Sequence, residues 1–259
     1  NQMKVVSSYA KMYEDVCDEA EDLRVSIVLI TFHKHQRLDG KMETGKEGMR
    51  TTNQKVLRHA PCTVGIFVDR GQTGFQQPRI DAVQNVATLF FGGADDREAL
   101  ACSMRISSHP YINVTLIRFR LPPSFDEGKP SVDETCLRND EILMAISEDD
   151  TEQDYDNACV EDFYERFVST GKVGYVEKFV ASGLETVETL RSMEEMFSLF
   201  IVGKGARGHS RMTTGMSDWE ECPELGAVGD LLASSELSVT ASILVIQQHR
   251  HCSNDLRGD

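Results

Sequence analysis

Short apolar runs rich in β-branched residues alternate with helical patterns along most of the chain. The run Val25–Ile30 carries no charge, whereas the charged stretch before it, Tyr13–Leu23, places its apolar residues on one side. Strands and helices that alternate at this length build parallel sheets covered by helices, so the sequence predicts an α/β fold with mostly parallel sheets. Further strands are expected at Thr63–Val68, Val86–Phe91, Asn113–Phe119, Val173–Val180, Leu199–Val202 and Ser242–Gln247, further helices at Asn53–His59, Asp96–Ser108, Asn157–Ser169, Glu185–Met196 and Gly226–Ser235, and a Gly-containing polar loop at His35–Gly48.

The order of elements repeats, which predicts two related units, each with its own sheet. Each unit has a strand, a charged helix, a buried strand, a long Gly-containing loop, a helix and a closing strand; in the first unit the opening strand is Val5-Val6. We place the first unit at residues 1–71, a linker at 72–82 and the second unit at 83–259. The second unit also begins with a β-α-β segment, Val86 to Phe119, that the first unit lacks. Because the first strand of a doubly wound sheet is usually central, we expect a longer N-terminus or a partner to fill this gap.

The negative charge is concentrated in one segment. The chain has a formal net charge of −15, and 14 acidic residues against 2 basic ones fall between Phe125 and Asp162. Such a chain repels phosphate backbones, so we expect no nucleic-acid partner. The segment also repels itself and offers few large apolar residues, so we expect an acidic insert at about 123–156 that is largely mobile.

Cysteines and hydropathy limit the compartment. The seven cysteines are widely spaced without any CxxC pair, which favours reduced thiols, and no cluster of ligands predicts a metal site. No stretch approaches the roughly 20 apolar residues that span a bilayer, so we expect no direct membrane insertion by this chain. A membrane-spanning portion ahead of residue 1 is compatible with these observations.

A first Gly-containing turn links the expected strand Val86–Phe91 to the helix after it. Gly92 and Gly93 would let the backbone approach a ligand, and the N-terminus of the following helix attracts anions. The alternative is a structural turn in which Asp95 or Asp96 caps the helix.

A second Gly-rich loop is the best candidate for anion binding. It follows the strand Leu199–Val202 and joins three glycines to basic side chains in an acidic protein. The alternative is a flexible surface loop, because no helix starts directly after it. If both loops open at the carboxyl edge of one sheet, a nucleotide or other anion would sit between them. The candidate site residues are Gly92, Gly93, Asp95, Gly203, Lys204, Gly205, Arg207 and Gly208.

No arrangement of a nucleophile, a base and an oxyanion donor is evident, so we expect no enzyme. Asp218–Leu225 does combine acids with the thiol of Cys222, but an acidic setting disfavours a thiolate. Packing of Trp219 is the structural alternative for this stretch.

Several segments together resemble the cytosolic C-terminal region of the plant cation/proton exchanger (CHX) family, monovalent cation/proton antiporters. They include Phe90–Leu100, Phe200–Gly205, Asp218–Gly226, Gly229–Ser235 and His59–Gly71 with Thr31–Lys34. The resemblance covers nearly the whole chain apart from the acidic segment. It implies a membrane-spanning antiporter portion ahead of residue 1, on whose cytosolic side this chain lies, and a homodimer in the full-length protein. The implied function is regulation of K⁺ or Na⁺ exchange for protons, in the plasma membrane or an endomembrane.

The half-units in turn resemble universal stress protein domains, some of which bind ATP. By analogy with dimers of those domains, the closing strands Thr63–Val68 and Ser242–Gln247 should pair with each other. The ATP-binding pattern is incomplete, because Gly92 stands where an Asp is needed and Ala206 where a second loop glycine is needed. This resemblance implies at most a weakly bound nucleotide and no certain cofactor. The alternative function is a stand-alone nucleotide-binding stress-type module.

Overall fold

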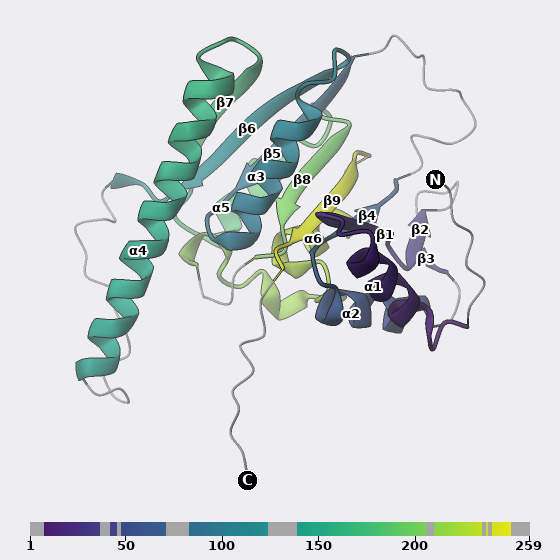
Figure 1. Ribbon diagram of the computed structural model, residues 1–259. Coiled ribbons are helices and arrows are strands. Elements are labelled where there is room, and N and C mark those ends of the chain that lie inside the picture. Colours follow the sequence, from purple (N-terminus) through teal and green to yellow (C-terminus); the bar gives the residue numbers. More distant parts are fainter. Residues whose placement is uncertain are drawn as a thin grey trace.

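A computed structural model describes residues 8–36, 42–45, 48–70, 83–123, 139–205, 210–234, 237 and 240–249 of the chain. Its main feature is one seven-stranded sheet in the order β1-β4-β9-β8-β5-β6-β7 (Figure 1). Every neighbouring pair in this sheet is parallel except β4 and β9, so the predicted α/β fold with a mostly parallel sheet is confirmed. The strands are β1 (Ile27–Thr31), β4 (Thr63–Val68), β5 (Gln84–Phe90), β6 (Ile112–Arg120), β7 (Val173–Phe179), β8 (Leu199–Gly203) and β9 (Ser242–Gln247).

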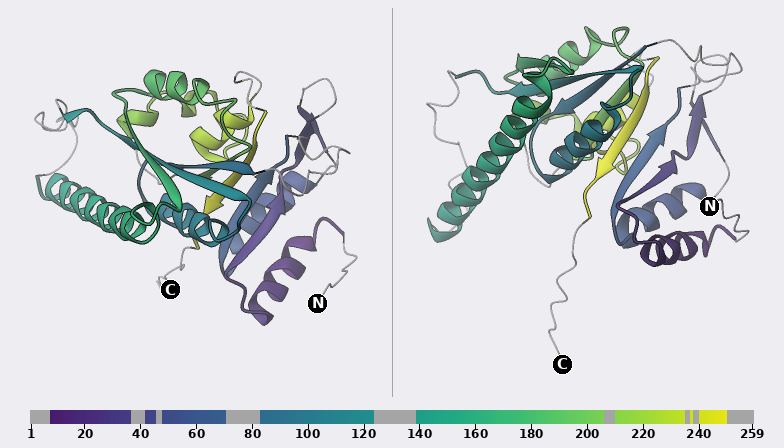
Figure 2. Two further views of the ribbon diagram at one scale, coloured as in Figure 1. Left: turned by 90° about the horizontal axis from the view of Figure 1, so that it is seen from above. Right: turned by 45° about the horizontal axis from the view of Figure 1, so that its top comes forward.

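Helices cover both faces of the part of the sheet formed by β5 to β9. On one face α3 (Ala94–Ile106) and α4 (Asn139–Phe163) pack through Leu100 and Phe163 onto Ile201 and Ile246. On the other face α5 (Gly183–Arg191) and α6 (Gly226–Ala233) pack onto a second cluster that includes Phe200. Figure 2 shows the two pairs of helices on opposite sides of the strands. Burial on both faces explains why β8 and β9 are nearly continuous apolar runs rather than alternating ones.

Two more helices belong to the first half of the chain. The helices α1 (Met12–Asp22) and α2 (Met49–His59) contact each other and form a third cluster around Val56 and Val64. Ile30 and Leu57 pack against both this cluster and that of α5 and α6. The apolar core therefore continues across the boundary between the two halves on this face.

The closing strands of the two predicted units pair with each other, as expected. β4 and β9 run antiparallel, with Ile66 opposite Val245 at the centre of the ladder. This pairing corrects the expectation of two sheets, because the β4–β9 ladder merges the strands of both halves into one. Pairing the closing strands removes two edges that would otherwise present unsatisfied backbone groups.

Two stretches expected to be irregular contain regular structure. Within His35–Gly48 a small antiparallel sheet forms from β2 (Lys34–Gln36) and β3 (Met42–Thr44). In the acidic segment α4 starts at Asn139, so residues 139–156 are helical and not irregular, while their mobility stays a prediction. Two acidic residues of this helix, Glu152 and Asp156, form ion pairs with Arg97 of α3. Val5-Val6, the linker 72–82 and residues 124–138 lie outside the described residues.

Candidate functional site

The two Gly-containing loops meet at one edge of the sheet, as the sequence predicted. β5 and β8 are parallel neighbours, so the turn after β5 and the loop after β8 open on the same side. Between them lies a cavity of about 310 Å³. Its lining includes Gly92, Gly203, Lys204 and Gly205 of the predicted site, with Asp96 and residues from 210 to 228. Residues 206–209, which include the predicted Arg207 and Gly208, lie outside the described part of the chain.

Asp96 joins the two loops. Its carboxylate accepts hydrogen bonds from the backbone N–H groups of Phe91 (2.6 Å), Gly92 (2.9 Å) and Gly203 (2.8 Å). Burial raises the pKa of Asp96 to about 7, although the three N–H donors favour its ionised form. The donors that the sequence assigned to a bound anion are thus used by an acid of the protein itself.

A second carboxylate occupies the N-terminus of α3. Asp156 of α4 accepts a hydrogen bond from the Gly93 N–H at 2.8 Å and pairs with the Arg97 guanidinium. Arg97 also pairs with Glu152 one turn earlier in α4, at 2.7 Å. A helix N-terminus favours negative charge, so Asp156 takes the place that an external anion would need. Sequence reasoning missed this contact because nothing local links Asp156 to the Gly-Gly turn.

The remaining predicted site residues contact the end of β9. Lys204 donates from Nζ to Gln247 Oε1 at 3.0 Å, and Asp95 accepts from the Gln248 backbone N–H at 2.8 Å. Gly93, not Asp95 or Asp96, is the N-cap residue of α3, which corrects the capping alternative. Among the described residues that line the cavity, Lys204 is the one with a cationic side chain.

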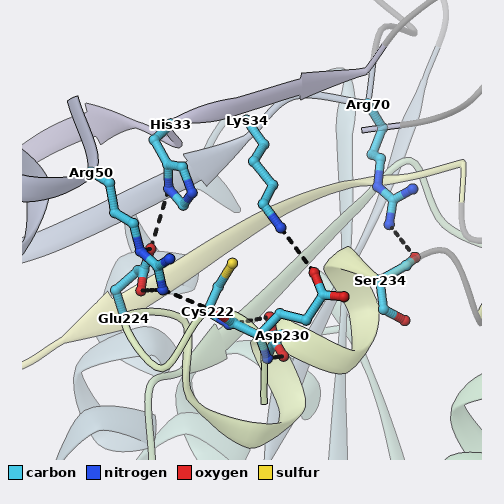
Figure 3. Close-up of polar contacts among 9 residues, drawn as sticks. His33, Lys34, Arg50, Arg70, Cys222, Glu224, Asp230 and Ser234 are labelled. Atoms are coloured by element: carbon cyan, nitrogen blue, oxygen red, sulfur yellow. Dashed lines mark hydrogen bonds and ion pairs between the residues drawn. The ribbon is translucent and has the colours of Figure 1, made fainter. Parts of the chain in front are cut away.

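A second polar cluster connects the two halves of the chain (Figure 3). Glu224, whose side chain is fully buried, contacts His33 Nδ1 and Arg50 Nε, each at 3.2 Å. Lys34 pairs with Glu221 at 2.9 Å. His33, Lys34 and Arg50 come from the first half and both acids from the loop before α6, so these polar contacts bridge the halves.

The thiol of Cys222 lies beside this bridge. Ligand atoms of His33, Cys222 and Glu224 lie within 4.8 Å of one another, the kind of grouping that can hold a metal ion. The cations Arg50 and Lys34 already face these groups, which opposes a second positive charge. Burial raises the pKa of the Cys222 thiol and burial lowers that of His33, so neither a thiolate nor an imidazolium is favoured. We interpret the cluster as a structural bridge, which the separation of its residues in sequence concealed.

Arg70 makes a further contact between the halves at the end of β4. Its buried guanidinium donates to the carbonyl oxygens of Leu232 (2.7 Å) and Ser234 (2.9 Å). These carbonyls end α6, where a cation is favourable to the helix dipole. The bridge and Arg70 thus hold the first half against the loop before α6 and against the C-terminal end of α6.

Comparison with known proteins gives the family. A model of the "Plant cation/H(+) antiporter, C-terminal domain" matches residues 83–247, and a model of the "Plant cation/H(+) antiporter domain" matches residues 1–72. The chain belongs to the plant cation/H(+) antiporter family. The resemblance inferred from the sequence is therefore confirmed.

Two antiporters of Arabidopsis thaliana illustrate the relationship of this chain to longer proteins of the family. Cation/H(+) antiporter 1 is 51% identical over 96% of the chain, and cation/H(+) antiporter 2 is 50% identical over all of it. The chain spans 32% and 33% of these relatives, about a third of their length. Among the described residues, no helix combines the length and apolar character needed to cross a bilayer.

Among solved structures, the chain is similar to a universal stress protein from Archaeoglobus fulgidus. The TM-score is 0.38 at 10% identity, with 91% of this chain and 65% of that one covered.

Proposed function

We propose that this chain is the cytosolic regulatory domain of a monovalent cation (K⁺ or Na⁺)/proton antiporter. The observation that carries the proposal is the match to antiporter models along both halves of a chain that spans only a third of its relatives. The membrane-spanning portion of the same protein is its partner, and the full-length protein is a homodimer. Within the domain we divide the chain at the linker 72–82 into units at 1–71 and 83–259.

The polar bridge suggests how such a domain would act. The charged contacts of Glu224 and Glu221 tie the first half to the loop before α6, next to the cavity. A domain changes transport only if it contacts two states of the transporter unequally. A shift of one half against the other would change which surface faces the membrane portion, and the bridge resists such a shift.

The alternative is a stand-alone nucleotide-binding module of the stress type. Its supporting feature is the cavity between the two loops with Lys204 on its wall. Against it, the N–H groups of Gly92, Gly93 and Gly203 already donate to Asp96 and Asp156. A nucleotide phosphate would have to displace one of these carboxylates, so we treat ligand binding as secondary to regulation.

The test compares a full-length antiporter with one that lacks the region equivalent to residues 1–259, at matched abundance in the membrane. We expect a changed exchange rate or a changed pH dependence of exchange. Because a deletion can disturb assembly, the second arm uses Glu224→Gln, with Glu221→Gln on the same loop as the matched control. Glu224→Gln should alter transport more than Glu221→Gln. Identical transport in all four proteins, across pH and cation concentration, would eliminate the regulatory role.

A further inference from the structure

The loop before α6, residues 220–225, lies between the first half of the chain and the cavity. On one side its acids Glu221 and Glu224 pair with cations of the first half. On the other side Glu220 and Pro223 line the cavity. A displacement of this loop from the first half therefore also changes the wall of the cavity.

His33 is the titratable group at the buried end of this contact (Figure 3). It is 3% exposed, and its Nδ1 lies 3.2 Å from Oε1 of Glu224, whose side chain is fully buried. The imidazole packs edge-to-face against the ring of Phe32, with 4.4 Å between the ring centroids. Within the described part of the chain, neither Nδ1 nor Oε1 takes part in a well-aligned hydrogen bond. The contact therefore depends on the charges of the two groups, and an imidazole changes its charge within the cellular range of pH.

The charges around His33 are balanced while its imidazole is neutral. The groups that face it come from three elements: Glu224 and Cys222 from the loop, Arg50 from α2 and Lys34 from β2. Arg50 is already matched by Glu224, and Lys34 is matched by the second acid of the loop. A proton on His33 therefore adds a third positive charge to two complete ion pairs. Such a charge costs free energy in a buried position, because the nearby acids are already shared with other cations.

The direction of the pH effect follows from this surplus of positive charge. Burial lowers the pKa of His33, the carboxylate of Glu224 partly offsets this effect, and the two cations add to it. A solvated imidazole titrates near about pH 6.5, so the closed contact binds a proton less readily than an open one does. Below about pH 6.5, each unit of acidification favours the open arrangement by up to about tenfold, until the closed state is protonated as well.

We propose that His33 is a proton-operated switch: its protonation expels the imidazole from beside Glu224 and releases the loop before α6 from the first half. Because the same loop lines the cavity, the cavity changes shape with it. The inference deepens the proposed function by naming protons as the signal, and it rests on that function for any effect on transport.

Two contacts confine the change to this region. Asp230 of α6 accepts hydrogen bonds from the backbone N–H groups of Glu221 (2.8 Å) and Cys222 (3.1 Å), so the released loop stays attached to α6. The β4–β9 ladder lies in the apolar core and stays intact. Proton binding therefore shifts the loop and reshapes the cavity without unfolding the domain.

The experiment measures how fast a thiol reagent reaches Cys222, which is 2% exposed in the loop, in the full-length antiporter purified in detergent micelles. The reagent is a dithiodipyridine, and each labelling rate is divided by that of free cysteine at the same pH to remove the effect of thiol ionisation. Between pH 7.5 and 5.5 the rate at Cys222 should rise at least about fivefold. The buried thiol of Cys62 in the first half reports general unfolding, and its rate should change less than about twofold.

His33→Asn is the decisive variant, because an amide keeps a donor near the Nδ1 position but takes up no proton in this range of pH. It should leave Cys222 protected at both pH values, whereas His109→Asn, at an exposed position, should keep the rise. A rise that persists in His33→Asn would overturn the proposal. So would a rate at Cys222 that is equal or lower at pH 5.5, since the imidazolium would then hold the contact closed.

Exchange of the imidazole C2 hydrogen, followed by mass spectrometry, supplies a readout that needs no variant. In the unaltered protein its midpoint at His33 should lie below about pH 6.5, the ordinary value for an imidazole. A midpoint at or above that value would contradict the proposal. Neither measurement depends on transport, so a failure here and a failure of the regulatory role are seen separately.

Discussion

Leu29 and Ile201 occupy the same register position in the two halves of the sheet, yet 61% of Leu29 is exposed and none of Ile201. The two side chains are isomers of nearly equal volume and similar hydropathy, so the residue type does not explain the difference. The helix α3 covers Ile201, and no described helix covers Leu29. The difference in exposure therefore follows from the position of each strand in the sheet, because β1 ends the sheet order of the described strands and β8 lies inside it.

The buried carboxyl of Asp96 predicts an unusual dependence of stability on pH. Its pKa in the folded protein is about 7, raised from 3.8 by burial, so the folded state holds a proton that the unfolded state releases. Stability from this group is present below about pH 4 and is lost as pH rises to 7, at up to about 1.4 kcal/mol per pH unit. In urea unfolding from pH 4 to 8, the free energy of unfolding of Asp96→Asn should rise relative to that of the natural protein as pH rises.

The opposite trend would mean that the N–H donors outweigh burial and lower the pKa of Asp96. Asp96→Ala is the companion variant, because it leaves the N–H groups of Phe91, Gly92 and Gly203 without their acceptor. It should cost at least about 2 kcal/mol at every pH in this range.

Two glutamates on one loop should differ in their effect on stability. Glu224→Ala leaves the buried His33 and the 44% exposed Arg50 without their shared partner, and should lower the free energy of unfolding by about 2 kcal/mol or more. Glu221 is 78% exposed in its pair with Lys34, so Glu221→Ala should cost less than about 1 kcal/mol. Equal losses in urea unfolding would show that the bridge is solvated.

Two glycines with positive φ allow the cost of backbone strain to be measured apart from the cost of steric overlap. Gly171 (φ +73°) has nothing within 4 Å of a Cβ position, so Gly171→Ala should cost about 1 kcal/mol. Gly226 (φ +68°) faces the Lys204 carbonyl so closely that a Cβ atom would overlap it. Gly226→Ala should therefore cost about 3 kcal/mol or more and displace the loop after β8. Similar melting temperatures for the two variants would contradict this reading of the loop.

Nucleotide binding should be weak. Calorimetry with ATP, ADP and AMP should give dissociation constants near the millimolar range, about −4 kcal/mol, because the nearby N–H donors are already engaged. Lys204→Ala should weaken any binding, and Lys172→Ala, at an exposed position away from the cavity, should leave it unchanged. Tight binding that survives both Lys204→Ala and Gly205→Val would place the ligand elsewhere.

Local sequence patterns determined most of the strands and helices. Thr63–Val68 and Ser242–Gln247 form strands with the predicted bounds, since buried β-branched runs have few alternatives once turn residues flank them. The meeting of the Gly92 turn with the Gly203 loop also followed from the sequence, because parallel strands end at the same edge. The acidic segment was the exception: its charge predicted mobility, and the structure has α4 from Asn139.

The sequence by itself thus determined the α/β class, the placement of the strands and the loops that face the cavity, because these depend on neighbours within a few residues. Only the tertiary structure decided what the polar groups do. Asp156 reaches Gly93 from a helix 63 residues away, and Glu224 meets His33 across most of the chain. Such contacts depend on how helices pack on a shared sheet, which brings together residues that no local pattern connects.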